Sequence, residues 1–254
     1  MNDRWDQSRT AIVTGGASGI GLAIATRLAT DGAAVAIADL DDSAAAAAAE
    51  AMRADGLNTL GLGVDVTDRS GVRNAVAQVT SDLGPVTILV NSAGLDGFTP
   101  FLKITDDAWQ RILAANLTGT FICCQEVVPQ MIDAGWGRIV NISSSSAQTG
   151  NPLMTHYSAA KAGVVGFTKA LALELGPKGI TVNSIPPGFV DTPMLRRSEE
   201  RGFLGDGVEH HERTTPVRRV GHPDDIAAAC AFLTGDEAGY VTGQVLAVNG
   251  GRTT

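Results

Sequence analysis

The sequence predicts an α/β fold in which a doubly wound parallel sheet of about seven strands is covered by helices on both faces. Short runs rich in β-branched residues alternate with longer segments of helical pattern, which is typical of a three-layer parallel sheet with crossover helices. The 254 residues fit one α/β domain. No proline-rich linker or fixed-period repeat divides them, so we expect a single catalytic domain spanning residues 1–254.

Seven segments have the pattern of buried strands. They are short, largely apolar and bounded by Gly, Asp, Asn or Ser. In chain order they are Thr10–Thr14, Ala34–Ala38, Leu60–Val64, Thr87–Asn91, Gly137–Ile142, Thr181–Ile185 and Gln244–Val248. Strands that are apolar throughout are buried on both faces, which agrees with a sheet between two layers of helices.

Six segments between these strands have helical pattern, and one long segment has neither pattern. The helices are expected at Gly19–Thr30, Ser43–Asp55, Arg69–Leu83, Asp106–Met131, Met154–Leu175 and Pro223–Leu233. Six successive alanines favour the second of them. The exception is Thr192–His222, which is charged, contains glycine and is long for a loop. Loops of that length are usually functional or disordered, and we expect a substrate-binding lid at 192–222.

Composition and charge exclude several classes of function. Apolar residues make up 44% of the chain and charged residues 18%, which permits a large core and excludes a disordered acidic chain. The 19 basic and 27 acidic residues give a net charge of −8 without a basic stripe, so we expect no nucleic-acid or membrane partner. No apolar run approaches the ~20 residues that span a bilayer. Because Met1–Arg9 also lacks a signal-peptide pattern, we expect a cytoplasmic protein.

The cysteines and the paired histidines do not predict a metal site. Cys123, Cys124 and Cys230 form no Cys-x-x-Cys pair, and buried reduced thiols are favoured over a disulfide or a metal centre. His210 and His211 are adjacent and lack the spacing of metal ligands. We therefore expect no bound metal.

A glycine-rich turn, Thr14–Gly21 with the sequence TGGASGIG, joins the first expected strand to the first helix. Its glycines allow a tight turn and close approach to a pyrophosphate, and the helix N-terminus offers free N–H groups to phosphate. The spacing Gly-x-x-x-Gly-x-Gly differs from the best-known dinucleotide fingerprint. A Rossmann-type dinucleotide site is the functional interpretation, and a tight junction without a ligand is the alternative.

Asp39 strengthens the dinucleotide interpretation and indicates NAD. It ends the second strand, 18 residues after Gly21. A carboxylate at this point hydrogen-bonds the ribose hydroxyls of NAD and repels the 2′-phosphate of NADP. No Arg or Lys occurs within Gly15–Gly21, and Leu40 follows Asp39, so a phosphate-binding cation is absent from both expected places. The alternative is that Asp39 only caps a loop.

Tyr157 and Lys161 lie four residues apart on an expected helix and therefore share one face. A lysine ammonium nearby favours the phenolate and lowers the tyrosine pKa from about 10, as general acid–base catalysis requires. Ser144 follows the fifth strand and faces the same crevice. Spacing to Tyr157 selects Ser144, although Ser143, Ser145 and Ser146 adjoin it. Asn116, unfavourable inside a helix, is expected there for a reason other than propensity.

Together these motifs resemble the short-chain dehydrogenase/reductase family, in its single-domain form of roughly 250 residues. The resemblance covers nearly the whole chain. Thr14–Gly21 is similar to the family's cofactor turn, Asp65-Val66 to its adenine segment, and Pro187–Thr192 to the segment that closes over nicotinamide. Asn91–Gly94 resembles its Asn-Asn-Ala-Gly element with Ser92 in place of the second Asn, and Pro186 replaces a usually smaller residue. We expect Ser92 to rearrange the site locally and Pro186 to stiffen the pocket rim.

The resemblance implies a catalytic tetrad and a set of NAD contacts. Tyr157 would exchange a proton with the substrate oxygen, Ser144 would orient that oxygen, Lys161 would tune Tyr157 and hold the nicotinamide ribose, and Asn116 would support a water that links Lys161 to solvent. The implied cofactor-binding residues are Gly15, Ser18, Gly19, Ile20, Gly21, Asp39, Asp65, Val66, Asn91, Ala93, Gly94, Tyr157, Lys161, Pro187, Gly188, Val190 and Thr192.

The substrate is less constrained than the cofactor. Candidate contacts are Leu95, Ser146, Gln148, Met154, His156 and Phe189, which are apolar or weakly polar and do not obviously invite a charged substrate. A structural role for His156 is equally open. We expect an NAD-dependent enzyme that interconverts a secondary alcohol and a ketone. A 3-oxoacyl-carrier-protein or CoA reductase is the first alternative, and a non-catalytic NAD-binding regulator is the second.

Two further expectations come from the same resemblance. An epimerase or dehydratase of this fold usually has a longer chain with a substrate domain, which argues against that activity. The family is commonly tetrameric, and Asp106–Met131, Met154–Leu175 and Val248–Gly251 would supply the interfaces of a homotetramer.

Overall fold

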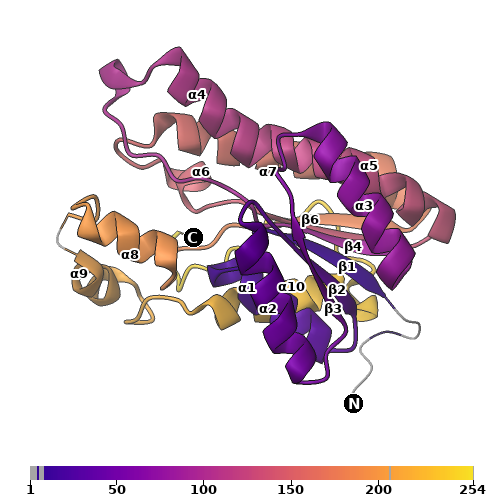
Figure 1. Ribbon diagram of the computed structural model, residues 1–254. Helices are drawn as coiled ribbons and strands as arrows, with labels where there is room; N and C mark the ends of the chain where they lie inside the picture. Colours follow the sequence, from indigo (N-terminus) through magenta and orange to yellow (C-terminus); the bar gives the residue numbers. More distant parts are fainter. Residues whose placement is uncertain (1–4, 6–8, 206, 254) are drawn as a thin grey trace.

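The computed structural model describes Trp5, residues 9–205 and residues 207–253. Six strands form one parallel sheet in the order β3-β2-β1-β4-β5-β6 (Figure 1). They are β1 (Thr10–Thr14), β2 (Ala34–Asp39), β3 (Thr59–Gly63), β4 (Val86–Asn91), β5 (Gly137–Ile142) and β6 (Ile180–Ile185). The order reverses between β1 and β4, and ligands bind at such a switch point, beyond the carboxyl ends of the strands. The expected polar terminus, residues 1–9, lies mostly outside the described residues.

Helices cover both faces of the sheet and confirm the expected three layers (Figure 1). One face carries α1 (Gly19–Thr30), α2 (Asp42–Ala54) and α10 (Pro223–Thr234), and the other carries α3 (Arg69–Leu83), α5 (Gly119–Ala134) and α7 (Thr155–Leu175).

Successive side chains of a strand point to opposite faces of the sheet, so alternate residues pack into the two helix layers. Val13 packs with Ile24 of α1, whereas its neighbour Ile12 packs with Val76 of α3. The three cysteines are free and buried, and burial raises the pKa of the Cys123 thiol to about 12.

The seventh expected strand, Gln244–Val248, is not a regular member of the sheet. It runs beside β6 and makes isolated parallel bridges, Ser184 to Val245 and Pro187 to Val248. The backbone N–H groups of Ser184 and Gly188 donate to the carbonyl oxygens of Gln244 and Val248. Pro186, which lies between them on this ladder, has no N–H to donate, so the ladder is interrupted and the strand count is six.

The segment Asp106–Met131, expected as one helix, is divided by a change of helix type. It consists of α4 (Asp106–Leu113), a π-helical turn at Ala114–Thr118, and α5. Asn116 lies in the π turn, and such turns are frequent at functional sites. The low helix propensity of Asn116 therefore indicated a real departure from α-helical geometry at this point.

Taken together, Asp106–Ala134 is long and apolar enough to cross a membrane by length and composition alone. This is weak evidence for a membrane span, because core helices pass the same test. The α5 part packs against β4, β5 and α3, and that packing accounts for its apolar inner face.

The expected lid is largely helical. Residues 192–222 contain α8 (Pro193–Glu200) and α9 (Gly207–Thr214), which lie together beyond the carboxyl ends of the strands (Figure 1). Thr192 caps α8, where its Oγ1 accepts a hydrogen bond from the N–H of Leu195 at 3.2 Å, and Pro193 occupies the first turn. Leu204, Val208 and Val220 form a small core of their own, on which Phe189 and Leu195 pack.

Candidate active site

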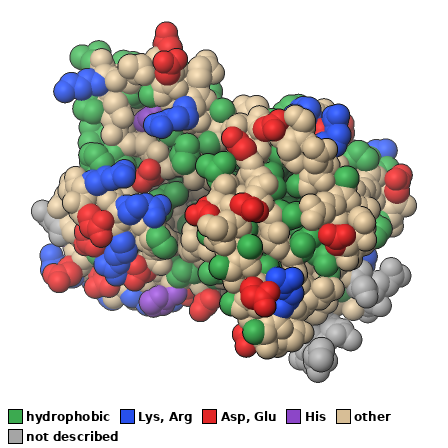
Figure 2. Space-filling model, viewed as in Figure 1, with side chains coloured by type: hydrophobic (Ala, Val, Ile, Leu, Met, Phe, Trp, Pro, Cys, Tyr) green, Lys and Arg blue, Asp and Glu red, His purple; other side chains and the backbone are tan. Residues whose placement is uncertain are grey.

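A cavity of about 850 Å³ runs along the carboxyl ends of the strands, from Asp39 to the lid. The molecule is visibly hollowed between the lid and the rest of the chain (Figure 2). All four predicted catalytic residues line the cavity: Asn116, Ser144, Tyr157 and Lys161. Predicted cofactor contacts that also line it are Gly15, Ser18, Gly19, Ile20, Gly21, Asp39, Asp65, Val66, Ala93, Gly94, Pro187, Gly188, Val190 and Thr192. Segments far apart in sequence therefore meet at one site.

The glycine-rich turn has no room for side chains at two positions. A Cβ on Gly21 would lie 2.1 Å from the carbonyl oxygen of Gly15, and a Cβ on Gly15 would lie 2.8 Å from Cα of Ala93. Gly15 also has a φ of +62°, which favours glycine. The turn delivers the first N–H groups of α1 to the cavity, where they can bind an anion such as pyrophosphate.

Asp39 ends β2 and lines the cavity next to this turn. Its Oδ2 accepts a hydrogen bond from the N–H of Ala17 at 3.1 Å, and its Oδ1 accepts one from the N–H of Asp41 at 3.2 Å. The side chain is thus oriented by two backbone donors, as in a loop cap, and it also lines the cavity. Asp65 and Val66 lie beyond β3 on the same side, and no Lys or Arg in residues 15–67 lines the cavity.

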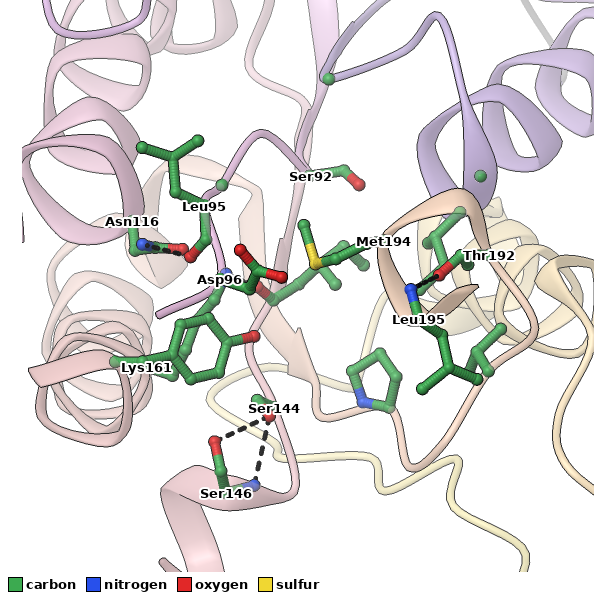
Figure 3. A pocket seen from close by; sticks show the side chains of 18 of the residues that line it. Ser92, Leu95, Asp96, Asn116, Ser144, Ser146, Lys161, Thr192, Met194 and Leu195 are labelled. Atoms are coloured by element: carbon green, nitrogen blue, oxygen red, sulfur yellow. Dashed lines mark hydrogen bonds between the residues drawn. The ribbon is translucent and has the colours of Figure 1, made fainter. Parts of the chain in front are cut away.

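Ser144 and Tyr157 lie together at the other end of the cavity, close enough for the Ser144 hydroxyl to oppose the rise in the Tyr157 pKa. The Oγ of Ser144 accepts hydrogen bonds from the N–H of Ser146 at 3.2 Å and from its Oγ at 2.9 Å (Figure 3), which leaves the Ser144 proton to donate. Ser143 instead accepts from Ser184 at 2.8 Å inside the sheet. The Ser143 hydroxyl is therefore bonded within the sheet, whereas the Ser144 hydroxyl is bonded to Ser146 on the cavity side.

Lys161 and Asn116 flank Gly94. Lys161 is only 5% exposed, and its Nζ donates to the carbonyl oxygen of Ile142 at 2.9 Å. The Nδ2 of Asn116 donates to the carbonyl oxygens of Leu95 and Ile112, both at 3.0 Å, whereas its buried Oδ1 has no partner. A Cβ on Gly94 would lie 2.5 Å from that oxygen and 3.4 Å from Lys161 Nζ. The two polar atoms therefore border one small space, where a water would satisfy the amide oxygen.

Burial controls the titration of this cluster. It lowers the pKa of Lys161 to about 8. It also raises the pKa of Tyr157 above the ordinary value; the hydrogen bond from Ser144 opposes this rise and the charge of Asp96 adds to it. Lys161 was expected to lower the tyrosine pKa, but desolvation of the phenolate is the larger effect. Lys161 Nζ lies 5.8 Å from the Tyr157 ring centroid.

Comparison with known proteins agrees with this arrangement. A family model described as enoyl-(acyl carrier protein) reductase matches residues 15–253. The acetoacetyl-CoA reductase of Allochromatium vinosum is 43% identical over 249 residues, covering 96% of this chain and 98% of that protein. The chain belongs to the short-chain dehydrogenase/reductase family.

Two further members of this short-chain dehydrogenase/reductase family differ in the cofactor that their names state. The 2-dehydro-3-deoxy-L-rhamnonate dehydrogenase (NAD(+)) of a Sphingomonas species is 39% identical, covering 97% of this chain and 96% of its own length. A crystal structure of an actinorhodin polyketide ketoreductase variant with NADPH has a TM-score of 0.92 and 37% identity, covering 96% of this chain and 97% of that one. Both are oxidoreductases. The comparisons therefore show the fold and the enzyme class of this chain, but they do not decide between NAD and NADP as its cofactor.

The segment Pro187–Thr192, which the resemblance places over nicotinamide, borders the cavity. Pro187 accepts a backbone hydrogen bond from Ser145 at 3.0 Å, and Gly188 packs so closely on Asn249 that a Cβ would lie 2.9 Å from its Cα. Thr192 reaches the cofactor turn, since its Cβ lies 3.4 Å from the position of a Cβ on Gly19. Ser92 does not disturb the turn, because the N–H groups of Ser92 and Ala93 both donate to Thr14 Oγ1.

Three expected site residues do not line the cavity. Asn91 is buried in the sheet, where its Nδ2 donates to Asn141 Oδ1 at 2.8 Å. His156 is 2% exposed and packs on Gly97, so the structural alternative fits it better. Gln148 is exposed and accepts a hydrogen bond from Thr253 at 3.2 Å. Leu95, Ser146, Met154 and Phe189 do line the cavity.

The structure adds charged residues that the sequence did not single out. Asp96 follows β4 and points into the cavity on the side of Lys161 (Figure 3), and its Oδ2 accepts a hydrogen bond from Ser198 of α8 at 3.1 Å. Arg197 of α8 and Arg252 near the C-terminus also line the cavity. Asp96 lies close after the Asn91–Gly94 motif, which was a usable signal. The two arginines reach the site only through tertiary folding.

Proposed function

We propose that this chain is an NAD-dependent oxidoreductase that interconverts a secondary alcohol and a ketone by hydride transfer. The observation that carries the proposal is that Ser144, Tyr157 and the buried Lys161 line one cavity together with the glycine-rich turn and Asp39. Such a cavity holds a proton donor and a dinucleotide together, and positioning of this kind supplies much of the acceleration.

The residues present fit NAD. The turn around Gly15 and Gly21 packs too closely to admit side chains, so its bare backbone can approach a pyrophosphate, and the start of α1 presents N–H groups to it. The oriented carboxylate of Asp39 suits two ribose hydroxyls and opposes a 2′-phosphate. The absence of a lining cation within residues 15–67 supports the same choice.

The chain's own residues would handle the proton. A bound nicotinamide supplies or accepts the hydride. Ser144 donates a hydrogen bond to the substrate oxygen, and Tyr157 gives that oxygen a proton during reduction or removes it during oxidation. Lys161 is largely protonated below about pH 8, and its charge offsets part of the cost of a buried phenolate. Asn116 supports a water beside Lys161 through its unpartnered Oδ1.

Reduction of a 3-oxoacyl thioester is the second candidate. It is favoured by the similarity to proteins named acetoacetyl-CoA reductase and 3-oxoacyl-[acyl-carrier-protein] reductase, which are 43% and 40% identical. The product of that reaction is itself a secondary alcohol, so the same proton donor serves both candidates. A non-catalytic NAD-binding regulator is the third, and it is disfavoured because no member of the tetrad is missing.

A turnover screen tests the proposal. NAD and NADP are each tested with secondary alcohols, cyclic diols, hydroxysteroids and 3-hydroxyacyl thioesters, in both directions. We expect turnover with NAD, and a Tyr157→Phe loss of about 10²–10⁴-fold with cofactor binding retained. Tyr240→Phe is the matched control, because Tyr240 is fully exposed. Equal rates in wild type and Tyr157→Phe would refute the role of Tyr157, and NAD binding without any turnover would favour the regulator.

A further inference from the structure

The C-terminal segment folds back onto the substrate side of the cavity. Asn249 closes a turn in which its Nδ2 donates to the carbonyl oxygen of Thr253 at 3.1 Å and its Oδ1 accepts from the N–H of Gly251 at 3.0 Å. Thr253 Oγ1 then donates to Gln148 Oε1 at 3.2 Å. These contacts hold Arg252, the residue inside the turn, at the cavity wall.

The guanidinium of Arg252 is one of three planar groups that stack on one another. Its guanidinium carbon lies 4.3 Å from the ring centroid of Phe189, and Phe189 stacks on His211 of α9 at 3.7 Å with an interplanar angle of 14°. All three side chains line the cavity, and they come from the C-terminal turn, the segment after β6, and the lid. Stacking on an aromatic face holds the planar guanidinium in a fixed orientation.

The guanidinium of Arg252 lacks a counterion among the described residues. Its Nη1 is buried without a hydrogen-bond partner in the described part of the chain, and burial lowers its pKa. A buried cationic donor without a partner is costly, and charge-assisted bonds to carboxylate or phosphate are the usual remedy.

The described residues that line the cavity after Asp65 include more bases than acids. The acid among them is Asp96, whose Oδ2 is already bonded to Ser198. Arg111, Arg197 and Arg252 are among the bases. The expectation that the pocket does not invite a charged substrate is therefore revised.

We propose that the substrate carries an anionic group, a carboxylate or a phosphate, which Arg252 binds while the carbonyl or alcohol oxygen lies at Tyr157 and Ser144. This inference rests on the proposed function and specifies its substrate class. Arg252 is a specificity residue in this arrangement: it fixes the remote end of the substrate. Its contribution therefore appears mainly in KM and only for substrates that bear the charge.

Two matched substrate pairs test the inference. Reduction of acetoacetate is compared with that of methyl acetoacetate, and reduction of acetoacetyl-CoA with that of the neutral N-acetylcysteamine thioester. The variants are Arg252→Gln, Arg252→Lys and the control Arg201→Gln, an exposed lid arginine that does not line the cavity. Thermal unfolding and NADH binding establish that each variant is folded.

We expect Arg252→Gln to raise KM for an anionic member by about tenfold or more, and to change its neutral partner less than threefold. Arg252→Lys should recover part of the loss, and Arg201→Gln should cause none. A loss with acetoacetate assigns the anion to a carboxylate, whereas a loss confined to the CoA thioester assigns it to a phosphate. An equal loss on charged and neutral members, or no loss on either, overturns the inference.

A binding measurement separates this inference from the proposed function. Acetoacetate and free CoA are titrated calorimetrically into the NADH-loaded wild type and Arg252→Gln. If no substrate turns over although NADH binds, the proposed function fails. The anion site still stands if one anion binds the wild type and binds Arg252→Gln at least tenfold more weakly. Without detectable binding or turnover of either anion by the wild type, the anion site is refuted as well.

Discussion

The carboxylate of Asp39 and the backbone N–H of Ala17 are joined by a 3.1 Å hydrogen bond that ties the end of β2 to the glycine-rich turn. One side chain thus both supports the turn and presents charge to the cavity. These two contributions are separable, because asparagine retains an acceptor oxygen without the charge.

We expect Asp39→Asn to lower the NAD-over-NADP preference in kcat/KM by about tenfold or more, since the repulsion of a 2′-phosphate disappears. Its melting temperature should stay near the wild-type value, whereas Asp39→Ala also loosens the turn and lowers it. Adding Leu40→Arg to Asp39→Asn should favour NADP. Steady-state kinetics with both cofactors gives the answer, and an unchanged ratio in all three variants would contradict the assignment of Asp39.

The buried, protonated Lys161 should lower the free energy of unfolding. Its folded-state pKa, about 8, lies below the ordinary 10.5, so the unfolded chain binds this proton more tightly. The resulting penalty is complete below about pH 8 and fades as the pH rises toward 10.5. Relative to Lys161→Met, the wild-type free energy of unfolding should increase by about 1 to 2 kcal/mol between pH 8 and pH 10.

Urea unfolding of wild type and Lys161→Met at several pH values measures this difference. Other titrating groups, including the buried cysteines, cancel in the comparison, and loss of the bond to Ile142 adds only a constant. A difference that does not change with pH would show that Lys161 keeps its ordinary pKa. Activity should fall in Lys161→Met at every pH.

Asp96 should set the pH dependence of alcohol oxidation. Its negative charge raises the pKa of Tyr157 beyond the effect of burial. Asp96→Asn removes the charge and keeps an acceptor for Ser198, so the rise of kcat/KM with pH should move to lower pH. Ser198→Ala breaks the 3.1 Å link and keeps the charge, so it should leave the profile in place. A profile unmoved by Asp96→Asn would exclude this electrostatic role.

The sequence predicted the layers well because burial of parallel strands leaves a strong local pattern. The strands β1 and β5 and the helices α1 and α3 lie at their expected bounds, and other common elements shift by only a few residues. Errors arose where pairing or helix type depends on neighbours. Pro186 interrupts the last strand through a missing donor on its partner. The poor helix propensity of Asn116 indicated an irregularity, but it did not specify a π turn. The capped start of α8 at Thr192-Pro193 was a readable helix signal that the lid interpretation did not use.

The residues of the candidate site also fall into two groups, those that short motifs predict and those that only tertiary packing brings together. The glycine-rich turn, Asp39, Ser144 and Tyr157 are recognisable because their motifs are short and their order is fixed. Arg252 belongs to no such motif, and it contacts Phe189 only because the C-terminal segment folds back onto the cavity. Residues brought to a pocket by the last segment of the chain are set by tertiary packing, which local patterns do not encode.

Assembly as a homotetramer is the last prediction. Leu173 of α7 is 83% exposed and Phe121 of α5 is 41% exposed, on the helices expected to form the interfaces. Burying such side chains in an assembly removes apolar surface from water. Light scattering should give four chains, and Leu173→Glu should dissociate them, whereas Leu102→Glu, at a 93% exposed site outside the expected interfaces, should not. Val248–Gly251, also expected there, packs on Gly188 within the chain and is a weaker candidate. A monomeric wild type would refute this assembly.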